Sequence, residues 1–381
     1  MLKELKKDHH ITYLTLDDGS AEPSHYDRSS EYANDVITVA HRSATKFSVK
    51  FYSELIRNLV SDMPYALQKY VSAEMREKIS FLTANQKFDI LVCDFLAPAV
   101  NLPAVLNLPT LLFQHNVEAM IWRRHFEVAE NIFRKLYFKL QWKRMVAHER
   151  SACKRFDSVV AVSEQDAEIM KDAYDVRSIS HVGTGVDTVY FSEGHGEVSR
   201  GPEIVFTGSM DWLPNDDAIR WFLQEVFPHI QEKLPDASLS VVGRNPPQSL
   251  IEYCHRRRGV TVTGSVPDVR PYLRAARCYV VPIRIGGGTR LKIYEAMAMS
   301  LPVVSTSVGA EGLPVNDGEG IFIRDNPGDF AEAVIELLSN PAMARDLGQT
   351  GASIVRNRFS WDRITADFNA ACVAAVSEHA E

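Results

Sequence analysis

Short runs of β-branched and apolar residues alternate with longer stretches of helical period through almost the whole chain. This alternation is typical of parallel β-sheets covered by helices on both faces, so it predicts an α/β fold. The strand candidates in the second half are Ile204–Gly208, Leu239–Gly243, Val260–Gly264, Tyr279–Ile283, Pro302–Thr306 and Ile321–Arg324. Those in the first half, which we expect to form a second sheet, are Ile11–Leu16, Val36–Val39, Phe88–Cys93, Thr110–Phe113, Ser158–Val162 and Ser178–Val182.

The length of the chain, 381 residues, exceeds the usual range of about 100–200 for one domain. Residues 191–202 are polar and rich in glycine, and we interpret them as a linker between an N-terminal domain, 1–195, and a C-terminal domain, 196–361. The clearest helical period covers residues 215–234. Doubly wound sheets bind ligands at the carboxyl ends of their strands, so we expect substrates in a cleft between the domains.

Composition and charge are those of a soluble globular protein. The chain is 45% hydrophobic and 24% charged, and its net charge of −7 gives no global reason to expect nucleic-acid binding. No run of about 18 apolar residues could span a bilayer, and Met1–Asp8 lacks the apolar core of a signal peptide. The cysteines are scattered without a C-x-x-C pair, so we expect free, buried thiols in a reducing cytoplasm. They are Cys93, Cys153, Cys254, Cys278 and Cys372.

The most informative stretch contains three consecutive glycines, Gly286–Gly288, between a strand end and a helix that begins near Thr289. Glycines let the backbone approach a ligand, and the N–H groups at a helix start attract an anion such as a diphosphate. Arg290 and Lys292 add positive charge in the first turn, where cations are unfavourable for a helix alone. Their position indicates a function, although the run fits neither a Walker A loop nor the G-x-G-x-x-G fingerprint.

Lys292 and Glu295 are three residues apart and share one helix face. An ammonium for phosphate and a carboxylate for ribose hydroxyls could therefore reach one ligand, which indicates a nucleoside diphosphate site. The alternative is that the glycines form an ordinary loop and that Lys292 and Glu295 are a solvent-exposed ion pair.

At these residues the chain resembles the family 4 glycosyltransferases, which are retaining, nucleotide-sugar-dependent enzymes with the GT-B fold. The resemblance covers nearly the whole chain. Its motifs are Gly286–Ala298 with Leu301–Thr306 after it, Val205–Met210, Val242–Arg244, Thr263–Asp268 and Gly185–Asp187. It implies two Rossmann-like domains facing a central cleft. The first is the acceptor-side domain, completed by a C-terminal helix over 362–381, and the second binds the nucleotide sugar.

The resemblance implies that a sugar passes from a nucleotide diphosphate donor to a hydroxyl of a glycan or lipid-linked acceptor, in a hexosyltransferase reaction of bacterial polysaccharide biosynthesis. It implies no cofactor beyond the nucleotide sugar. Two cations beside the glycines and the lack of an Asp-x-Asp motif lead us to expect a reaction without metal. The implied catalytic residues are His115, Arg290, Lys292 and Glu295. The implied donor-binding residues are Gly208, Ser209, Gly243, Arg244, Gly264, Val266, Gly287, Gly288 and Thr289.

The chain departs from the family pattern in three places. Gly287 stands where members commonly carry the first of two glutamates. Residues 209–211 lack the Arg and Lys that often follow the strand glycine, and Thr184 replaces a common Asn. We therefore expect Arg290 and Lys292 to neutralise the phosphates.

Two other functions remain as alternatives. One is a catalytically inactive nucleotide-sugar-binding subunit of a polysaccharide synthesis complex, and the other is a GT-B sugar-nucleotide epimerase.

His115 follows the strand candidate at residues 110–113, which would deliver it to a loop at the cleft. A lone histidine is more often structural, but the matching position in similar enzymes is a histidine beside the donor sugar. Asp94 ends the preceding strand, and we expect it either to face the cleft or to cap a helix.

Residues 123–156 are basic and aromatic, and could bind an anionic membrane or a lipid diphosphate acceptor. The alternative is an amphipathic helix with a solvated basic face, in which Phe133, Leu136, Leu140 and Met145 pack on the sheet. We expect a cytoplasmic protein. If residues 123–156 bind a membrane, we expect a peripheral contact at the inner face of the cell membrane.

The beginning of the chain predicts an incomplete sheet. Met1–Asp8 has the pattern of a helix end, and Ile11–Leu16 that of the second strand of a doubly wound sheet, whose first strand is normally central. Without that strand, each buried backbone group left unpaired costs about 1–3 kcal/mol. We therefore expect the natural start roughly 25–35 residues upstream, enough for one strand, a loop and most of a helix.

Overall fold

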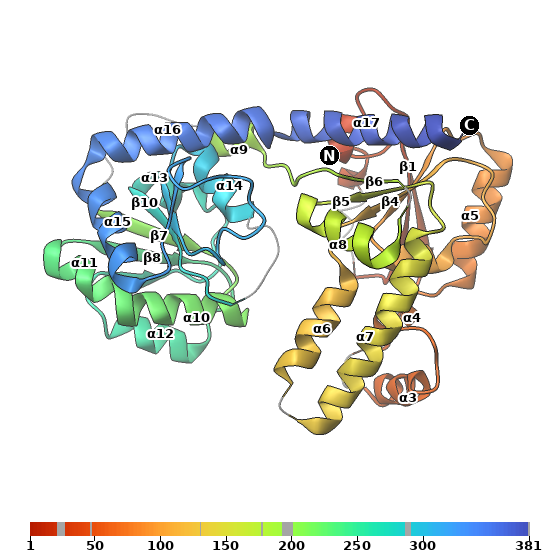
Figure 1. Cartoon of the computed structure of the whole chain (residues 1–381), viewed down its shortest axis with the longest axis horizontal. Helices are drawn as coiled ribbons and strands as arrows, with labels where there is room; N and C mark the ends of the chain where they lie inside the picture. Colours follow the sequence, from red (N-terminus) through yellow and green to blue (C-terminus); the bar gives the residue numbers. More distant parts are fainter. Residues whose placement is uncertain are drawn as a thin grey trace. The chain divides into compact units, whose positions relative to one another are not determined.

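The computed structural model describes residues 1–20, 27–45, 48–129, 131–176, 178–192, 201–285 and 291–379 (Figure 1). The chain divides into two compact units. Unit 1 consists of residues 1–183 and 365–381, and unit 2 of residues 184–364. The boundary lies at Thr184 and not at residue 195, because α9 (Thr188–Ser192) packs on a helix of unit 2. Most of the expected linker, residues 193–200, lies outside the described residues.

Unit 2 contains one parallel sheet of six strands in the order β12-β11-β10-β7-β8-β9. Apart from the first residue of β7 and of β8, every residue of the four inner strands is buried, as expected for strands covered on both faces. All six strands coincide with the strand candidates of the second half of the sequence. They are β7 (Glu203–Thr207), β8 (Ser238–Val242), β9 (Val260–Val262), β10 (Cys278–Val281), β11 (Val303–Ser305) and β12 (Ile321–Ile323).

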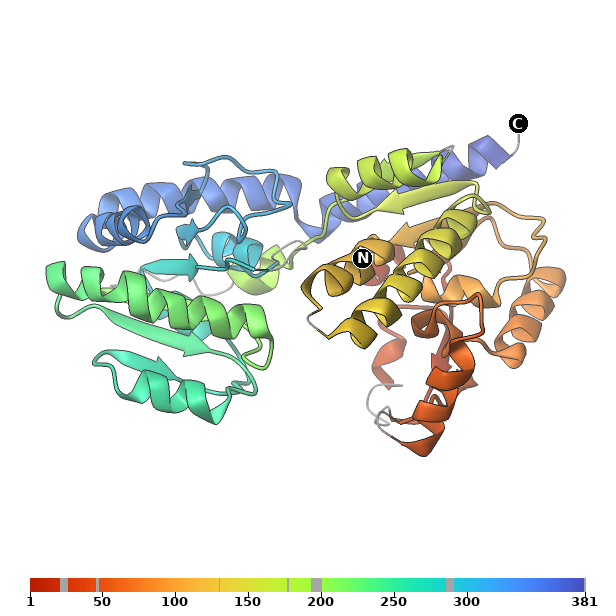
Figure 2. The same cartoon turned by 60° about the horizontal axis from the view of Figure 1, so that its bottom comes forward.

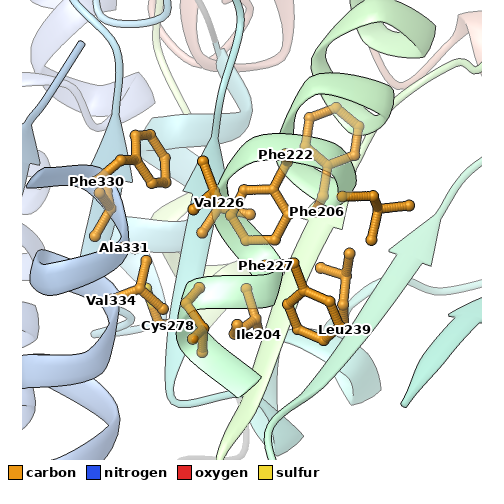
Figure 3. Packing of buried hydrophobic residues seen from close by; sticks show 14 of the residues in the cluster. Ile204, Phe206, Phe222, Val226, Phe227, Leu239, Cys278, Phe330, Ala331 and Val334 are labelled. Atoms are coloured by element: carbon orange, nitrogen blue, oxygen red, sulfur yellow. The ribbon is translucent and has the colours of Figure 1, made fainter. Parts of the chain in front are cut away.

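Alternate residues of these strands enter two separate cores. Ile204 and Phe206 of β7 join the core shown in Figure 3, together with Phe222, Phe227 and Phe330. The residue between them, Val205, enters the core on the opposite face. Helices therefore cover both faces, as the alternation of elements predicted, and Figure 2 shows the strands between helical layers.

The helix expected over residues 215–234 is one continuous helical segment with a π-helical turn at Phe222–Val226. Pro228 lies in the first turn of its last part, and a proline that lacks an N–H favours such a change of hydrogen-bonding register. The helices of this unit after α9 are α10 (Leu213–Trp221), α11 (Phe227–Lys233), α12 (Gln248–His255), α13 (Arg270–Ala275), α14 (Leu291–Ala298), α15 (Pro327–Ser339) and α16 (Pro341–Arg358).

Unit 1 contains all six strands expected in the first half, but they do not form the single sheet that we expected. β1 and β2 make a two-stranded parallel sheet, and β3, β4, β5 and β6 make a separate four-stranded one. The expectation was wrong because no described strand joins β1 to β3. The strands are β1 (Thr12–Asp17), β2 (Asp35–Ala40), β3 (Leu91–Asp94), β4 (Thr110–Gln114), β5 (Ser158–Ala161) and β6 (Ile179–His181).

The long helix α17 (Trp361–His379) begins in unit 2 and continues in unit 1. In unit 1 its Phe368 packs on Phe113 with ring centroids 4.9 Å apart, and His379 lies 3.2 Å from Asp157. The other helical segments of unit 1 are α1 (Leu2–Leu5), α3 (Val49–Asn58), α4 (Tyr65–Gln68), α5 (Ala73–Asn85), a 3₁₀ turn (Ala97–Asn101), α6 (Glu118–Val128), α7 (Ile132–Cys153) and α8 (Glu164–Tyr174).

Helix α7 corrects one part of the sequence analysis. Met145 is fully buried, as the amphipathic interpretation requires, but Phe133 and Leu136 are 79% and 59% exposed. They lie in the first turns of α7, and the α6–α7 hairpin projects from the sheet, so they have no core to pack on (Figure 1). Among the described residues, no helix is both long and apolar enough to cross a membrane. Four of the free thiols are buried as expected, and Cys372 is half-buried.

Candidate active site

Three glycines named in the sequence analysis meet at one edge of the sheet of unit 2. Gly208 follows β7, Gly243 follows β8 and Gly264 lies just after β9, and these strands are neighbours. The Gly208 N–H donates to Val242 O at 3.0 Å, and the Gly243 N–H donates to Gly264 O at 3.2 Å. A Cβ on Gly243 would lie 1.7 Å from the carbonyl oxygen of Gly208. Only glycine therefore allows these two loops to lie in backbone contact.

The loops after β7 and β8 are also joined by side chains. The Arg244 guanidinium donates from Nε to Ser209 Oγ at 2.8 Å, and Asn245 donates to Asp211 at 3.0 Å. Hydrogen bonds from Ser209 and Asn245 hold the pKa of Asp211 below its usual value. The structure thus brings together Ser209 and Arg244, two of the expected donor-binding residues. Val266 is half-buried against the core and contributes packing there.

Lys292, in the first turn of α14, reaches the carboxyl end of β7. Its ammonium lies 3.2 Å from Thr207 O and 3.2 Å from Asn215 Oδ1, and 4.2 Å from the centre of the Phe206 ring. The Lys292 side chain is half-buried. A positive charge is therefore held beside the glycine loops.

Asn215 was missed in the sequence analysis, although it holds this arrangement together. Its side chain is 4% exposed, accepts from Lys292, and donates from Nδ2 to Ser209 O at 2.8 Å. The amide also fills the space above Gly208, where a Cβ would come within 2.8 Å of it. No local pattern distinguishes this asparagine from an ordinary residue of an early helical turn.

Glu295 lies one turn after Lys292 on α14 and is half-buried. Burial raises the pKa of its carboxyl group, and the Lys292 ammonium acts in the opposite direction. Nearby, the hydroxyl groups of Tyr279 and Thr207 are hydrogen-bonded at 2.6 Å. Residues 286–290 lie outside the described residues, and with them Gly287, Gly288, Thr289 and Arg290.

In unit 1 the structure pairs His115 with Asp94. His115 Nε2 lies 2.7 Å from Asp94 Oδ1, and its ring stacks on Phe95 with centroids 3.8 Å apart and an interplanar angle of 17°. Phe95 has a φ of 71°, a left-handed conformation that is strained for an aromatic residue. Asp94 does not cap the following 3₁₀ turn, whose N-cap is Leu96, so its role as a helix cap is excluded.

The buried carboxylate of Glu149 accepts hydrogen bonds from both ends of the loop that carries His115. Glu149 of α7 accepts from the backbone N–H groups of Glu118 and Ala119 at 2.9 and 3.0 Å, which start α6. It also accepts from Gln114 at 3.2 Å and from the Tyr174 hydroxyl at 2.6 Å. Burial raises the pKa of Glu149 to about 7, although these hydrogen bonds act in the opposite direction. Because Gln114 and Glu118 flank the loop, Glu149 fixes both of its ends.

Two family models match the chain. The model described as Glycosyltransferase Family 4 matches residues 1–190, and the model described as Glycosyl transferases group 1 matches residues 201–340. The two matches together cover most of both units.

Known proteins resemble the chain over large parts of its length. A protein of the cps region of Klebsiella pneumoniae, uncharacterized and of 44.6 kDa, is 21% identical over 81% of this chain and 80% of its own length. D-inositol 3-phosphate glycosyltransferase 2 of Catenulispora acidiphila is 27% identical to this chain over an aligned region. That region covers 55% of this chain and 54% of the enzyme.

The solved structure of Anabaena HepE in complex with UDP is 14% identical, with a TM-score of 0.65 over 96% of this chain and 100% of that one. At this identity the likeness bears on the fold alone. Together with the family models, it shows that the chain is a glycosyltransferase enzyme that belongs to family 4 and has the two-domain GT-B fold.

Proposed function

We propose that this glycosyltransferase moves a sugar from a nucleoside diphosphate donor to a hydroxyl group of a glycan or lipid-linked acceptor, with retention of the anomeric configuration. The observation that carries the proposal is the Lys292 ammonium, which Asn215 and Thr207 O hold beside the glycine loops at the carboxyl edge of the sheet. In doubly wound folds this edge binds phosphorylated ligands. The structure of HepE, which has a similar fold, was solved in complex with UDP, and this supports a nucleotide as the ligand.

The chemistry requires a positive environment for the leaving group. As the bond between the anomeric carbon and the phosphate oxygen breaks, negative charge grows on the diphosphate. We assign its stabilisation to Lys292 and Arg290, with backbone N–H groups of residues 287–289. These two cations supply the charge that a divalent metal would otherwise provide, so the proposed reaction needs no metal.

The remaining residues have separate roles in this proposal. Glu295 accepts hydrogen bonds from the ribose hydroxyls, and the loops at Gly243, Arg244 and Gly264 contact the base. His115, oriented by Asp94 and the Phe95 ring, contacts the donor sugar. An imidazole ring has one nitrogen on each side that can take part in a hydrogen bond, so His115 can contact Asp94 and a sugar hydroxyl group at the same time.

We also propose a peripheral membrane contact through the α6–α7 hairpin, which would bring the enzyme to a lipid-linked acceptor. Phe133 and Leu136 are exposed there next to Arg134 and Lys139. Helix α3 presents a second exposed apolar face, and Asn58 at its end is bound by Arg144 of α7. Exposed apolar side chains among basic ones bind anionic lipid surfaces. Co-sedimentation with anionic and neutral vesicles tests this, because Phe133→Ser should weaken binding to anionic vesicles only if the hairpin inserts.

A thermal-shift screen against a panel of nucleotide sugars, followed by transfer and hydrolysis assays with the best binder, tests the proposed function. A ligand at about 100 times its dissociation constant adds roughly 2.7 kcal/mol of stability, which is readily detected. We expect one nucleotide sugar to stabilise the protein and to be consumed. Stabilisation without turnover in the presence of acceptors would favour a binding subunit, and inversion at the anomeric carbon would contradict the proposed stereochemistry.

A further inference from the structure

The loop after β11, residues 306–313, lies at the carboxyl edge of the unit 2 sheet. β11 pairs in parallel with β10, so the two strands end at the same edge. The glycine run Gly286–Gly288 follows β10 in the chain, and the other loops of the proposed donor site follow β7, β8 and β9. The loop after β11 is the next one along this edge, and the proposed function assigns no role to it.

Two buried hydroxyl groups hold the start of this loop against the end of β10. Ser305 Oγ donates to Val281 O at 3.2 Å, and Ser305 is fully buried. Thr306, which is 3% exposed, donates from Oγ1 to Ile283 O. Both carbonyl groups belong to the segment that leads from β10 toward the glycine run. The loop therefore has a fixed position relative to that segment.

Gly309 brings the loop close to the same segment. A Cβ at this position would lie 2.4 Å from Ser305 Oγ and 2.6 Å from Val281 O, so a larger residue would force the loop away from β10. The Gly309 N–H donates to Thr306 Oγ1 at 2.9 Å and closes the turn. The backbone that leads into the second half of the loop is thus fixed as well.

Glu311 stands between two core anchors of this loop. Ala310 before it and Leu313 after it are each 8% exposed and belong to the hydrophobic core that α14 also enters. Glu311 itself is half-buried. Its carboxylate makes no hydrogen bond or ion pair with any residue that the structure describes. A charged group is therefore held at a fixed place on this edge without a partner among these residues.

Other carboxylates in the loops at this edge are already engaged. Each aspartate in the described loops that directly follow β7, β9 and β12 accepts hydrogen bonds from its own surroundings. They are Asp211 with Ser209 and Asn245, Asp268 with Arg270, and Asp325 with Ser307. Glu311 differs from them, so its carboxylate is available to a ligand.

The chemistry of this carboxylate selects one part of a nucleotide sugar. A carboxylate that is partly removed from water needs hydrogen-bond donors, and its two oxygens can accept from two neighbouring groups. Phosphates are unsuitable because like charges repel. Hydroxyl groups are uncharged, and the hydrogen bonds that they donate to a charged acceptor are strong. Since the ribose is assigned to Glu295, the transferred sugar is the part that fits Glu311.

We propose that Glu311 binds the sugar of the donor by accepting hydrogen bonds from two neighbouring hydroxyl groups. This rests on the proposed function, because it requires a nucleoside diphosphate beside Lys292. Gly287 has no side chain, and Glu311 supplies from the next loop the carboxylate that Gly287 cannot offer. The ligand class is a nucleotide-linked sugar with two adjacent free hydroxyl groups.

The experiment measures binding, so it needs neither an acceptor nor turnover. Isothermal titration of the parent compares UDP, GDP and ADP with UDP-glucose, UDP-galactose, UDP-N-acetylglucosamine, GDP-mannose and ADP-glucose. The nucleotide sugar that binds best and its nucleoside diphosphate are then titrated into the variants. Glu311→Ala should bind the nucleotide sugar about 10- to 100-fold more weakly, the effect of losing hydrogen bonds to a charged group. Its affinity for the nucleoside diphosphate should not change.

Two further variants and a second measurement show where an effect comes from. Glu332→Ala removes a carboxylate from an exposed position of α15 in the same unit, and both affinities should equal those of the parent. Lys292→Ala should weaken the nucleoside diphosphate and the nucleotide sugar alike, because both carry the diphosphate. The melting temperature of Glu311→Ala should not fall, since its carboxylate supports no other described residue.

Unchanged affinity of Glu311→Ala for the nucleotide sugar would overturn the proposal while the proposed function stands. An equal loss of both affinities, or a melting temperature several degrees lower, would also overturn it, because Glu311 would then act on the fold of the site. If the parent bound none of these probes, the proposed function would itself be contradicted, and the role of Glu311 with it.

Discussion

The ammonium group of Lys292 lies 3.2 Å from the amide oxygen of Asn215, a residue 77 positions earlier in the chain. The same amide donates to Ser209 O, so one buried side chain connects the cation of α14 to the loop after β7. The position of the charge relative to the glycine loops therefore depends on packing within unit 2. This arrangement leads to two of the predictions below.

Replacing Lys292 by alanine should slow sugar transfer by about 100- to 1000-fold, because the variant loses a charge that stabilises the leaving diphosphate. Arg290→Ala should have an effect of similar size. Steady-state kcat/KM with a fixed acceptor measures both, and circular dichroism checks that the variants remain folded. Lys233→Ala, at the exposed end of α11, is the matched control and should behave as the parent. Parent-like turnover by both site variants would show that the donor phosphates bind elsewhere.

Asn215→Ala should lower kcat/KM by about 10-fold and also lower the melting temperature. The variant loses a hydrogen bond to a charged group, worth about 1.5–3 kcal/mol, and leaves the ammonium less constrained. Asn215→Asp keeps an oxygen for Lys292 but loses the donor to Ser209 O. It should therefore retain more activity than the alanine variant at a similar melting temperature, and the reverse order would contradict a positioning role.

His115→Ala should reduce kcat by about 100-fold with little change in nucleotide affinity, because the nucleotide is assigned to residues of unit 2. Asp94→Asn should cause a smaller loss of about 10-fold, since the asparagine can still accept a hydrogen bond from the imidazole. Kinetics and calorimetric titration with the nucleoside diphosphate separate the two effects. His229→Ala, at an exposed position of α11, is the control. If His115→Ala lowered the nucleotide affinity and left kcat unchanged, the assigned contact between His115 and the donor sugar would be wrong.

Transfer should continue at an unchanged rate in the presence of a strong chelator. The expectation follows from the two cations assigned to the diphosphate, Arg290 and Lys292, which make a bound divalent ion unnecessary. Initial rates with EDTA, and after addition of magnesium or manganese, provide the measurement. Activity that is abolished by the chelator and restored by either metal would refute this part of the proposal.

The raised pKa of Glu149 should make stability depend on pH. Its pKa is about 7 in the folded protein and near its ordinary value of 4.5 in the unfolded chain, so the folded state binds more protons between these values. The free energy of unfolding should therefore fall as the pH rises from about 4.5 to about 7, by on the order of 3 kcal/mol, and then level off.

The variant Glu149→Gln isolates this effect from the other carboxylates, because its side chain cannot ionise. Urea unfolding of parent and variant at several pH values gives the comparison. The free energy difference between parent and variant should change over the pH interval in favour of the variant. A constant difference would show that the carboxylate is ionised throughout.

The sequence was sufficient to predict the elements and the family. Every strand of both units was expected within a few residues, because a buried strand needs a local run of apolar residues that its own sequence contains. The motif around Gly286–Ala298 identified the enzyme class for a similar reason. Backbone approach, phosphate charge and a helix start require particular residues at fixed spacing, and such spacing is visible without a structure.

Interactions between distant residues appeared only in the tertiary structure. Asn215 in contact with Lys292, and Glu149 below the His115 loop, depend on which helices pack on which face, and no local pattern carries that information. The exposure of Phe133 and Leu136 was missed because a helical period shows which residues share a face but not what lies opposite. Likewise, apolar runs predicted the strands of unit 1, whereas their division into two sheets is a matter of edge pairing, which only the folded chain decides.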